Sequence, residues 1–339
     1  MIAVERRRTE RSRQPFLLLL LDAGNCLPSD KSGRVMGQVL SALSLATRET
    51  DITGWYVTNS VVGVMFTEIS IDERGSILTT VMSRVSETLQ SNLTLQNFSQ
   101  ISISLHVFPE DWNHENAPAN PAFYPDLVHR EKRQRGALAV KRMMDIVGSL
   151  VAIVIFAPVF LLVASIVKLG SKGPILFKQE RVGQFGRLFT FMKFRSMYAN
   201  NDPKIHQEFM KRVIDGSHDK PGSKMTDDPR ITRVGRFLRK SSLDELPQFF
   251  SVLKGDMSLV GPRPPIAYEC QEYDIWHRRR VLEVKPGLTG LWQVKGRSRV
   301  RFDDMVRLDL QYVRTWSLWL DIQILLKTPL AILLGGDAF

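Results

Sequence analysis

The sequence predicts an α+β protein in two parts, the second of which is attached to a membrane. Short apolar runs alternate with helix-like stretches over residues 15–108, and an uncharged apolar run extends from Ile146 to Val167. Polar loops rich in glycine, proline and arginine fill much of the remaining chain. The chain has 339 residues, of which 44% are hydrophobic and 24% are charged. It can therefore bury a large core, and its length favours two domains.

The first domain, residues 1–108, has the element order of a ferredoxin-like sheet. Its apolar runs and helix-like stretches follow the order β-α-β-β-α-β. Thr58, Asn59 and Ser60 tolerate turn geometry, so they predict a hairpin between the two middle strands. The predicted strands lie near 16–22, 53–58, 61–67 and 101–108, and the predicted helices near 32–49 and 73–92.

The N-terminal segment does not have the pattern of a signal peptide, and the segment after the first domain has the composition of a linker. Basic residues precede the apolar run Phe16–Leu21, which is too short for the core of a signal peptide and is not followed by a cleavage site of small residues. We therefore expect a buried strand there and a cytoplasmic N-terminus. Residues 109–136 are rich in proline, asparagine and charge, which predicts a linker. The second domain is then 137–339.

The net charge of +11 indicates an anionic partner. Nucleic acid, an anionic lipid surface and a phosphorylated substrate all satisfy that requirement. The basic residues lie around an apolar run and inside loops, not along one face studded with aromatic side chains, so we expect no nucleic acid partner. Cys26 and Cys270 lie far apart without the spacing of a metal or redox motif, which favours a reducing compartment.

The apolar run Ile146–Val167 has 22 residues, enough to cross a hydrocarbon core of about 30 Å. Pro158 lies in its middle, where it kinks or breaks a helix. Basic residues flank both ends, so the positive-inside rule gives no orientation. We predict a re-entrant helix over about 142–168, and a spanning helix and a buried core helix remain as alternatives. The flanking basic residues are Lys141, Arg142, Lys168 and Lys172.

The candidate reactive group is the adjacent pair Asp244 and Glu245. One interpretation is a capping box, in which Ser242 and Glu245 satisfy each other's backbone N–H at a helix start. The alternative makes Asp244 the cap, which places Pro247 among the free amides of the first turn. In both cases the carboxylates lie at a helix N-terminus, which keeps a carboxylate ionised and attracts phosphate. Such a carboxylate could attack phosphorus near a metal.

Arginines and tight Gly/Pro turns surround this pair in sequence. Arginine binds phosphate in a planar fork, and glycine lets backbone amides approach oxygen closely, so the set could form a diphosphate site. Ordinary loops with solvated arginines are the alternative. The residues and blocks concerned are Arg239, 259–264, 286–290 and 292–297.

Over about residues 137–334, the order of motifs resembles the bacterial sugar transferase family, the monotopic polyprenyl-phosphate phosphoglycosyl transferases. Besides the Asp-Glu pair, the motifs that carry the resemblance are Lys141-Arg142 with Asp145, the helix broken by proline, 173–183, 193–197, 261–264, 287–290, Asp309 and Asp321.

This resemblance implies a two-step reaction on a covalent intermediate. Asp244 would attack the sugar-linked phosphorus of a UDP-sugar and expel UMP, and undecaprenyl phosphate would then accept the phosphosugar. Glu245, with Asp244, would hold Mg²⁺ against the diphosphate. The product, undecaprenyl-diphosphate-sugar, would begin exopolysaccharide, O-antigen or glycan assembly. The substrate-binding residues implied are Lys193, Arg195, Arg239, Arg263, Arg297, Asp309 and Asp321.

The resemblance also places the enzyme on the cytoplasmic face of the bacterial inner membrane. Lys141 and Arg142 would anchor the re-entrant helix at lipid headgroups. Ala157 stands where the family often has serine, so we expect one hydrogen bond that shapes the bend to be missing or replaced here. The C-terminal stretch Trp319–Leu334 is apolar but is interrupted by charge and proline, which suits an interfacial or core helix better than a span.

Residues 15–108 are also similar to a GGDEF-type nucleotide cyclase domain. Asp22 would be a remnant of a metal carboxylate, but the hairpin after Thr58 lacks the Gly-Gly and acidic residues that such catalysis needs. We expect a degenerate domain that regulates the protein or makes a homodimer. A rival interpretation of the whole chain is a membrane-associated, nucleotide-binding signalling protein without transferase activity.

Overall fold

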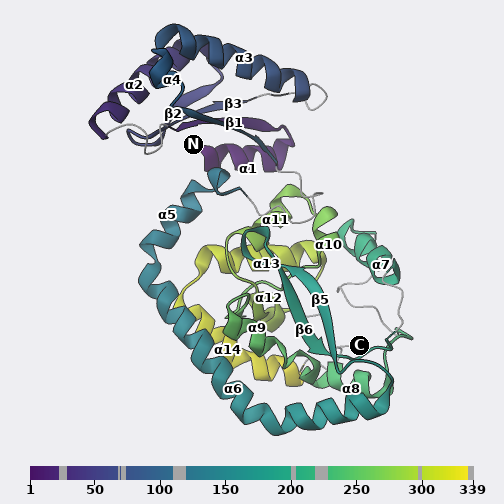
Figure 1. Cartoon of the computed structure of the whole chain (residues 1–339). Coiled ribbons are helices and arrows are strands. Elements are labelled where there is room, and N and C mark those ends of the chain that lie inside the picture. The colour runs from purple at the N-terminus through teal and green to yellow at the C-terminus, as the bar shows by residue number, and fades with distance from the viewer. Residues whose placement is uncertain are drawn as a thin grey trace. The chain divides into compact units, whose positions relative to one another are not determined.

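The computed structural model forms two compact units (Figure 1). The N-terminal unit comprises the described residues up to 109 together with 120–126, and the C-terminal unit comprises those from 127 onward. Helices and strands are present in both, as expected for an α+β protein. The structure describes residues 1–22, 29–67, 69, 74–109, 120–199, 204–217, 228–296 and 300–334.

The N-terminal unit is an antiparallel sheet of strand order β2-β3-β1-β4, with α2 and α3 packed on one face (Figure 1). Strand β1 is central, and both of its faces are buried because Leu19 and Leu21 face the helices while Phe16 packs on Phe108 and Phe123. The predicted order of elements is confirmed. The bounds are β1 Phe16–Asp22, α2 Ser29–Ala46, β2 Ile52–Val57, β3 Val61–Phe66, α3 Arg74–Asn92 and β4 Ser102–Phe108.

The predicted hairpin joins β2 to β3 at the expected residues. Asn59 adopts a left-handed backbone conformation with φ of 61°, which asparagine tolerates better than most residues. The Ser60 amide closes the turn on the Val57 carbonyl at 3.0 Å. Three further helices, which the sequence did not indicate, are α1 Ile2–Ser12, α4 Leu95–Phe98 and α5 Pro125–Arg133. The last of these lies within the segment predicted as a linker.

The C-terminal unit is mainly helical, with one antiparallel hairpin, β5-β6, and one short parallel pair, β7-β8. Cys270 is a buried free thiol in its core, and Cys26 lies outside the described residues. The elements are α6 Arg135–Gly170, β5 Leu176–Val182, η2 Gln184–Gly186, β6 Leu188–Phe194, α7 Lys204–Ile214, α8 Arg233–Ser241, η3 Leu243–Glu245, α9 Gln248–Lys254, β7 Ser258–Val260, α10 Ala267–Gln271, α11 Ile275–Leu282, β8 Gly287–Thr289, α12 Leu291–Lys295, α13 Phe302–Thr315 and α14 Leu318–Leu334.

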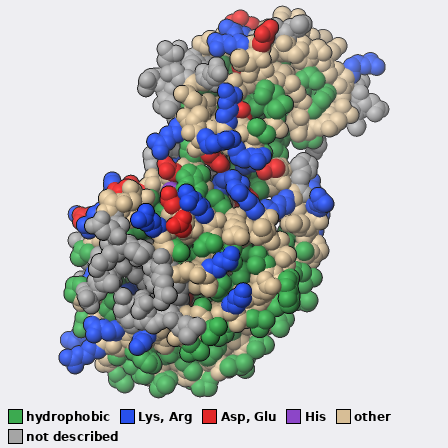
Figure 2. Space-filling view, turned by 180° about the vertical axis from the view of Figure 1, so that it is seen from behind, with side chains coloured by type: hydrophobic (Ala, Val, Ile, Leu, Met, Phe, Trp, Pro, Cys, Tyr) green, Lys and Arg blue, Asp and Glu red, His purple; other side chains and the backbone are tan. Residues whose placement is uncertain are grey.

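Helix α6 has the length and composition to cross a membrane. Its middle is exposed, with Val154 at 72% and Leu161 at 74% of their full accessible surface. The ribbon changes direction along its length in Figure 1, and Pro158 lies inside the helix. Figure 2 shows hydrophobic side chains gathered at the bottom of the C-terminal unit, where α6 runs in Figure 1. An apolar surface of this extent needs a partner other than water.

Helix α14 also exposes apolar side chains. Trp319 is 64%, Leu326 72% and Leu333 80% exposed, while Asp321 and Ile324 are buried on the opposite side. This division between an outward apolar face and an inward anchored face agrees with the predicted interfacial helix better than with a span.

The second half of α6 packs against the elements that carry Asp244. Val163 and Val167 form a buried cluster with Phe194, Leu238 and Leu246. Leu246 lies two residues from Asp244, so the segment that carries the candidate reactive carboxylate packs against the apolar helix.

Candidate functional site

A tight turn between two helices positions Asp244. Helix α8 begins at its cap Thr232, whose hydroxyl accepts a hydrogen bond from the Gly235 amide at 2.8 Å. It ends where Ser242 adopts a left-handed conformation with φ of 56°, and the chain then enters the 3₁₀ turn η3. This reversal places Asp244 in the interior with 6% of its surface exposed, while Glu245 beside it is half-buried.

Neither predicted capping arrangement is formed. The Ser242 side chain makes no capping hydrogen bond, and Pro247 occupies the cap position of α9. Pro247 tolerates that position because it has no N–H to satisfy. The two carboxylates therefore lie in the turn immediately ahead of α9, and not at its cap.

Helix α8 lies against the chain that leaves β6. A Cβ on Gly235 would meet the Ser196 carbonyl oxygen at 1.8 Å, so only glycine permits this approach. The Arg239 Nε donates to Ser196 Oγ at 3.0 Å, which fixes the direction of the guanidinium. Arg239 is thereby held on the same side of the unit as Lys193 at the end of β6.

Asp244 lies within electrostatic range of Lys193 and Arg239. Burial lowers the pKa of Lys193 to about 8, Asp244 raises it, and Arg239, Arg181 and Arg263 lower it further. Burial likewise lowers the pKa of Arg239, and Asp244 again opposes the shift. We call Lys193, Arg239, Arg181 and Arg263 the basic cluster. Its four cations exceed the three carboxylates that act on them, Asp244, Asp228 and Glu269, which suits a polyanionic ligand.

Arg181 on β5 is a member of the basic cluster that the sequence did not single out. Its Nη1 donates to the Pro264 carbonyl at 2.6 Å, and its guanidinium lies 4.6 Å from the centre of the Phe191 ring. Burial lowers its pKa to about 10. It holds the loop that carries Arg263, and its place in the motif 173–183 was the available signal.

A buried ion pair holds the same loop from the other side. Arg280 Nη2 lies 2.9 Å from Asp309 Oδ2 and donates to the Arg263 carbonyl at 3.0 Å. Both side chains are 1% exposed. Burial raises the pKa of Asp309 to about 7, although the Arg280 charge acts in the opposite direction. Asp309 therefore reaches the site only through Arg280 and does not face the basic cluster.

The two glycine loops contact each other through their backbones. The Gly261 amide donates to the Thr289 carbonyl at 2.9 Å, and the Gly287 amide to the Pro262 carbonyl at 2.8 Å. A Cβ on Gly287 would meet the Gly261 nitrogen at 2.0 Å. From the sequence, backbone amides of these loops were candidates to bind phosphate oxygens. In the structure, the Gly261 and Gly287 amides instead form hydrogen bonds between the two loops.

Comparison with known proteins identifies the larger part of the chain. Residues 136–335 match the model of the family described as bacterial sugar transferase, which covers more than half of the sequence. The chain belongs to this family. The region of the basic cluster and the apolar helix α6 both fall within the matched residues.

Three relatives illustrate the range of this family. The chain is 47% identical over 208 residues to the galactosyl transferase CpsE of Streptococcus agalactiae. The matched region covers 59% of this chain and 44% of the relative. It is 44% identical over 214 residues to the undecaprenyl-phosphate galactose phosphotransferase of Salmonella typhimurium, covering 62% and 44%. It is 39% identical over 211 residues to the UDP-glucose:undecaprenyl-phosphate glucose-1-phosphate transferase of Caulobacter vibrioides, covering 59% and 72%. The chain thus spans less than half of the first two relatives.

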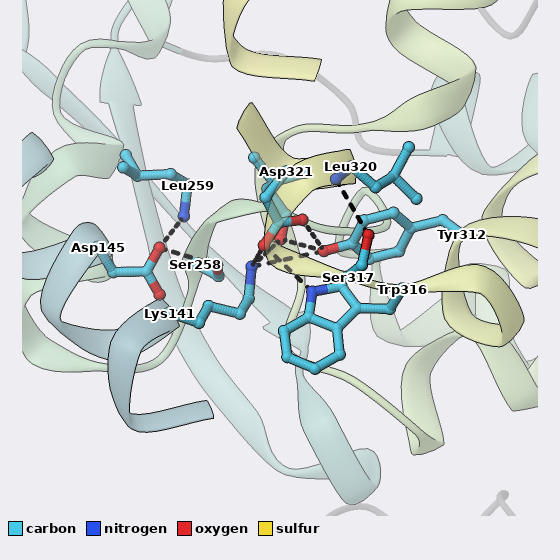
Figure 3. A network of polar contacts seen from close by, with 10 residues as sticks. Lys141, Asp145, Ser258, Leu259, Tyr312, Trp316, Ser317, Leu320 and Asp321 are labelled. Atoms are coloured by element: carbon cyan, nitrogen blue, oxygen red, sulfur yellow. Dashed lines mark hydrogen bonds and ion pairs between the residues drawn. The ribbon is translucent and has the colours of Figure 1, made fainter. Parts of the chain in front are cut away.

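In this sugar transferase family member, Asp321 anchors α6 to the globular part (Figure 3). Lys141 Nζ lies 2.6 Å from Asp321 Oδ2 and donates to the Val260 carbonyl at 3.0 Å. The Tyr312 hydroxyl and the Trp316 Nε1 donate to the same carboxylate at 2.8 and 3.1 Å. Asp321 is 2% exposed, so its role in the structure is to bind α6 and not to face the basic cluster.

Two further polar residues of α6, Arg142 and Asp145, complete this anchor. Arg142 donates to the carbonyls of Val252 and Leu253 at the end of α9, at 2.7 and 2.6 Å. Asp145 accepts from the Leu259 amide at 2.9 Å. Lys141 and Arg142, predicted to contact lipid headgroups, both bind the protein in the structure.

Arg195, predicted to bind substrate, donates to backbone carbonyls at and just beyond the end of α6, including that of Val167 inside the helix at 3.4 Å. Its Nη2 donates to the Ser171 carbonyl at 2.7 Å and its Nη1 to the Lys172 carbonyl at 2.9 Å. Helix ends leave such carbonyls without intrahelical partners, and an arginine can supply the missing donors. Arg195 thus lies apart from the basic cluster, and Arg297 lies outside the described residues.

Asp244 and Glu245 together offer two carboxylates to a metal ion. Among the residues that the structure describes, no group of three or more His, Cys, Asp or Glu side chains could hold one. Mg²⁺ is often bound by one or two carboxylates together with substrate phosphates and water. The pair therefore fits an ion that arrives with a diphosphate better than a permanently bound structural metal.

Removing one partner of the buried Lys141–Asp321 pair is expected to destabilise the C-terminal unit strongly. Lys141→Met or Asp321→Leu alone leaves an uncompensated buried charge, which costs about 3–5 kcal/mol. The double variant should recover a large part of that loss. The measurement is the free energy of unfolding of the detergent-solubilised protein, obtained from thermal or denaturant-induced unfolding.

Asp304→Asn supplies the control, because Asp304 pairs with Arg307 on the surface, where the two side chains are 52% and 69% exposed. Its cost should stay below about 1 kcal/mol. A Lys141→Met protein as stable as the Asp304→Asn protein would contradict the anchoring role.

Proposed function

We propose that this protein transfers a phosphosugar from a UDP-sugar to undecaprenyl phosphate, giving undecaprenyl-diphosphate-sugar and UMP. The observation that carries the proposal is the buried carboxylate of Asp244 within electrostatic range of Lys193 and Arg239. The names of two relatives support the acceptor, since both contain undecaprenyl phosphate, and one also names UDP-glucose as donor. The identity of the sugar is left to experiment.

In the proposed first step, an Asp244 oxygen attacks the phosphorus that bears the sugar. The bond from this phosphorus to the bridging oxygen breaks, and UMP leaves with the bond's electron pair. The sugar phosphate then remains on Asp244 as an acyl phosphate. In the second step, an oxygen of undecaprenyl phosphate attacks the same phosphorus and releases the Asp244 carboxylate.

A carboxylate and a diphosphate repel each other, which opposes this reaction. The positive charge of the basic cluster would offset that repulsion. Lys193 and Arg239 favour the ionised form of Asp244, since each interacts attractively with it. The same cations would draw the diphosphate oxygens close and offset the charge that moves onto departing UMP. Arg181 and Arg280 keep the Arg263 loop in place, so little reorganisation is needed when substrate binds.

Mg²⁺ is part of the proposal. Glu245 and Asp244 would hold it, and it would neutralise charge on the diphosphate. Glu245 is only half-buried beside the nucleophile, so it can reach a ligand that enters from solvent.

We propose further that α6 enters the cytoplasmic face of the bacterial inner membrane and returns to the same side. Its two flanks are tied to one globular unit, by Lys141 at the start and by Arg195 at the end. A straight span would separate these flanks by about 30 Å of hydrocarbon. The exposed residues between them, including Val154 and Leu161, would lie in lipid. The lipid-linked acceptor phosphate would then meet Asp244 near the membrane surface, because Leu246 packs against α6.

The N-terminal unit is proposed to act as a regulatory or dimerising module related to GGDEF-type domains. Its antiparallel four-stranded sheet supports that relationship, and the hairpin at Thr58 lacks the acidic residues of a working cyclase. Assembly of exopolysaccharide, O-antigen or another glycan is the proposed pathway.

Asp244→Asn should abolish UMP release from UDP-sugars. The amide is a poor nucleophile, so the rate should fall by at least about 10³-fold with no loss of folding. The assay uses the detergent-solubilised full chain with Mg²⁺, undecaprenyl phosphate and a panel of UDP-sugars. Asp304→Asn, a surface carboxylate change in the same unit, is the matched control. UMP release that survives in Asp244→Asn, or a folded wild-type protein that uses no UDP-sugar, would favour the signalling interpretation.

Removal of divalent ions should stop UMP release reversibly. EDTA is expected to reduce the rate to background and added Mg²⁺ to restore it, because the diphosphate charge is then offset again. Glu245→Gln should raise the Mg²⁺ concentration for half-maximal rate by about tenfold or more. Glu208→Gln, a change at an exposed side chain of α7, should leave that concentration unchanged. Full activity in EDTA would rule out the metal.

Both flanks of α6 should be accessible from the same side of the membrane. Single cysteines at the exposed positions Val140 and Leu169, in a chain with Cys26 and Cys270 replaced by serine, can be tested with a membrane-impermeant thiol reagent. In inside-out vesicles both should react, and in right-side-out vesicles neither should. Reaction from opposite sides would indicate a spanning helix.

A further inference from the structure

Two uncharged side chains from different helices meet beside the basic cluster. His206 on α7 and Tyr268 on α10 lie 62 residues apart in sequence, with 2.5 Å between His206 Nδ1 and the Tyr268 hydroxyl. Their rings meet edge to face, with centres 6.1 Å apart. Both side chains are half-buried, so a ligand can still reach them.

Their electrostatic surroundings place this pair close to the phosphate-binding charges. Burial is the largest cause that lowers the pKa of His206. Nearby positive charges lower it further, to about 4; they belong to Arg263, Arg181, Arg230 and Lys193. Burial raises the pKa of Tyr268 to about 12. Both groups are therefore uncharged near neutral pH. Lys193 also interacts with Asp244, so it lies within range of both the pair and the candidate nucleophile.

The two rings share one hydrogen bond, whose direction depends on which imidazole nitrogen carries the proton. A protonated phenol donates readily, and an unprotonated imidazole nitrogen accepts, so Tyr268 is assigned as donor to His206 Nδ1. The imidazole proton is then on Nε2, which makes His206 a donor toward a ligand. The Tyr268 oxygen keeps acceptor capacity. A neutral donor beside a neutral acceptor matches a hydroxyl group better than a phosphate.

His277 provides a contrast within the same unit. It is 2% exposed, its Nδ1 accepts from the Asp274 amide at 3.2 Å, and its Nε2 lies 3.2 Å from Asp303 Oδ1. Both nitrogens are occupied by protein partners, as expected of a structural histidine. His206 differs in exposure and in its position next to a cluster of cations.

We infer that His206 and Tyr268 bind a hydroxyl-bearing sugar ring of the nucleotide-sugar donor. This rests on the proposed function, because it takes the basic cluster to hold the diphosphate. A diphosphate in a nucleotide sugar connects two such rings, the ribose and the transferred sugar, and each lies directly beside a phosphate. A neutral pair at the border of the cluster can therefore contact one ring while Arg263 and Lys193 hold the phosphates. Their role is to recognise the donor, and not to take part in bond breaking.

The test compares wild type with His206→Ala and Tyr268→Phe in the detergent-solubilised full chain. Loss of one hydrogen bond should lower kcat/KM for the donor about tenfold, while KM for undecaprenyl phosphate and the melting temperature stay unchanged. If the ring is the transferred sugar, the preference between UDP-galactose and UDP-glucose changes and inhibition by UMP does not. If it is the ribose, UMP inhibition weakens by the same factor and the preference is kept.

Gln207→Ala is the matched control, since Gln207 is the exposed neighbour of His206 on α7. It should behave as wild type. Unchanged donor kcat/KM and UMP inhibition in both test variants would overturn the inference. An equal loss toward donor and lipid accompanied by a lower melting temperature would also overturn it, because that pattern indicates a purely structural pair.

Equilibrium binding of UDP-galactose, UDP-glucose and UMP separates this inference from the proposed function, because binding needs no turnover. Weaker binding to His206→Ala than to wild type supports the pair as a sugar-ring site even if no UMP is ever released. Equal binding to both proteins, or no binding of these ligands to wild type, overturns it even if Asp244-dependent turnover is demonstrated.

Discussion

Buried charges that pair across long stretches of sequence hold the C-terminal unit in one arrangement. Lys141 meets Asp321 at 2.6 Å, and Arg280 meets Asp309 at 2.9 Å. A charge removed from water is costly unless a partner compensates it. Each pair therefore ties its elements together: α6 to α14, and α11 to α13. Since Arg280 also binds the Arg263 carbonyl, the loop that carries Arg263 depends on the same constraint.

The same need for a charged partner explains how the candidate nucleophile Asp244 can be buried next to an apolar helix. Asp244 is 6% exposed, yet Lys193 and Arg239 compensate its charge. Leu246, two residues away, completes the contact with α6. Polar chemistry and a lipid-facing surface are thereby joined within one short segment. A water-soluble donor and a lipid-linked acceptor must meet at such a junction if the proposed transfer takes place there.

The motif residues that stand together in the family pattern serve two different purposes in the structure. Lys193 and Arg239 interact with Asp244, and Arg263 lies within electrostatic range of both cations. Asp309 and Asp321, by contrast, are 1% and 2% exposed and hold other elements in place. The second group keeps the geometry that the first group needs.

The sequence alone determined the four strands of the N-terminal unit, the β2-β3 hairpin and the family, because these follow from local periodicity, turn residues such as Asn59 and the order of motifs along the chain. It also predicts Asp244 as the nucleophile, which stays a prediction. Only the tertiary structure decided which partner each charged group finds: Arg195 caps α6, Pro247 replaces the predicted cap of α9, and His206 meets Tyr268 from 62 residues away. Those choices depend on packing between distant elements, where burial and the need to pair every buried charge outweigh local preference.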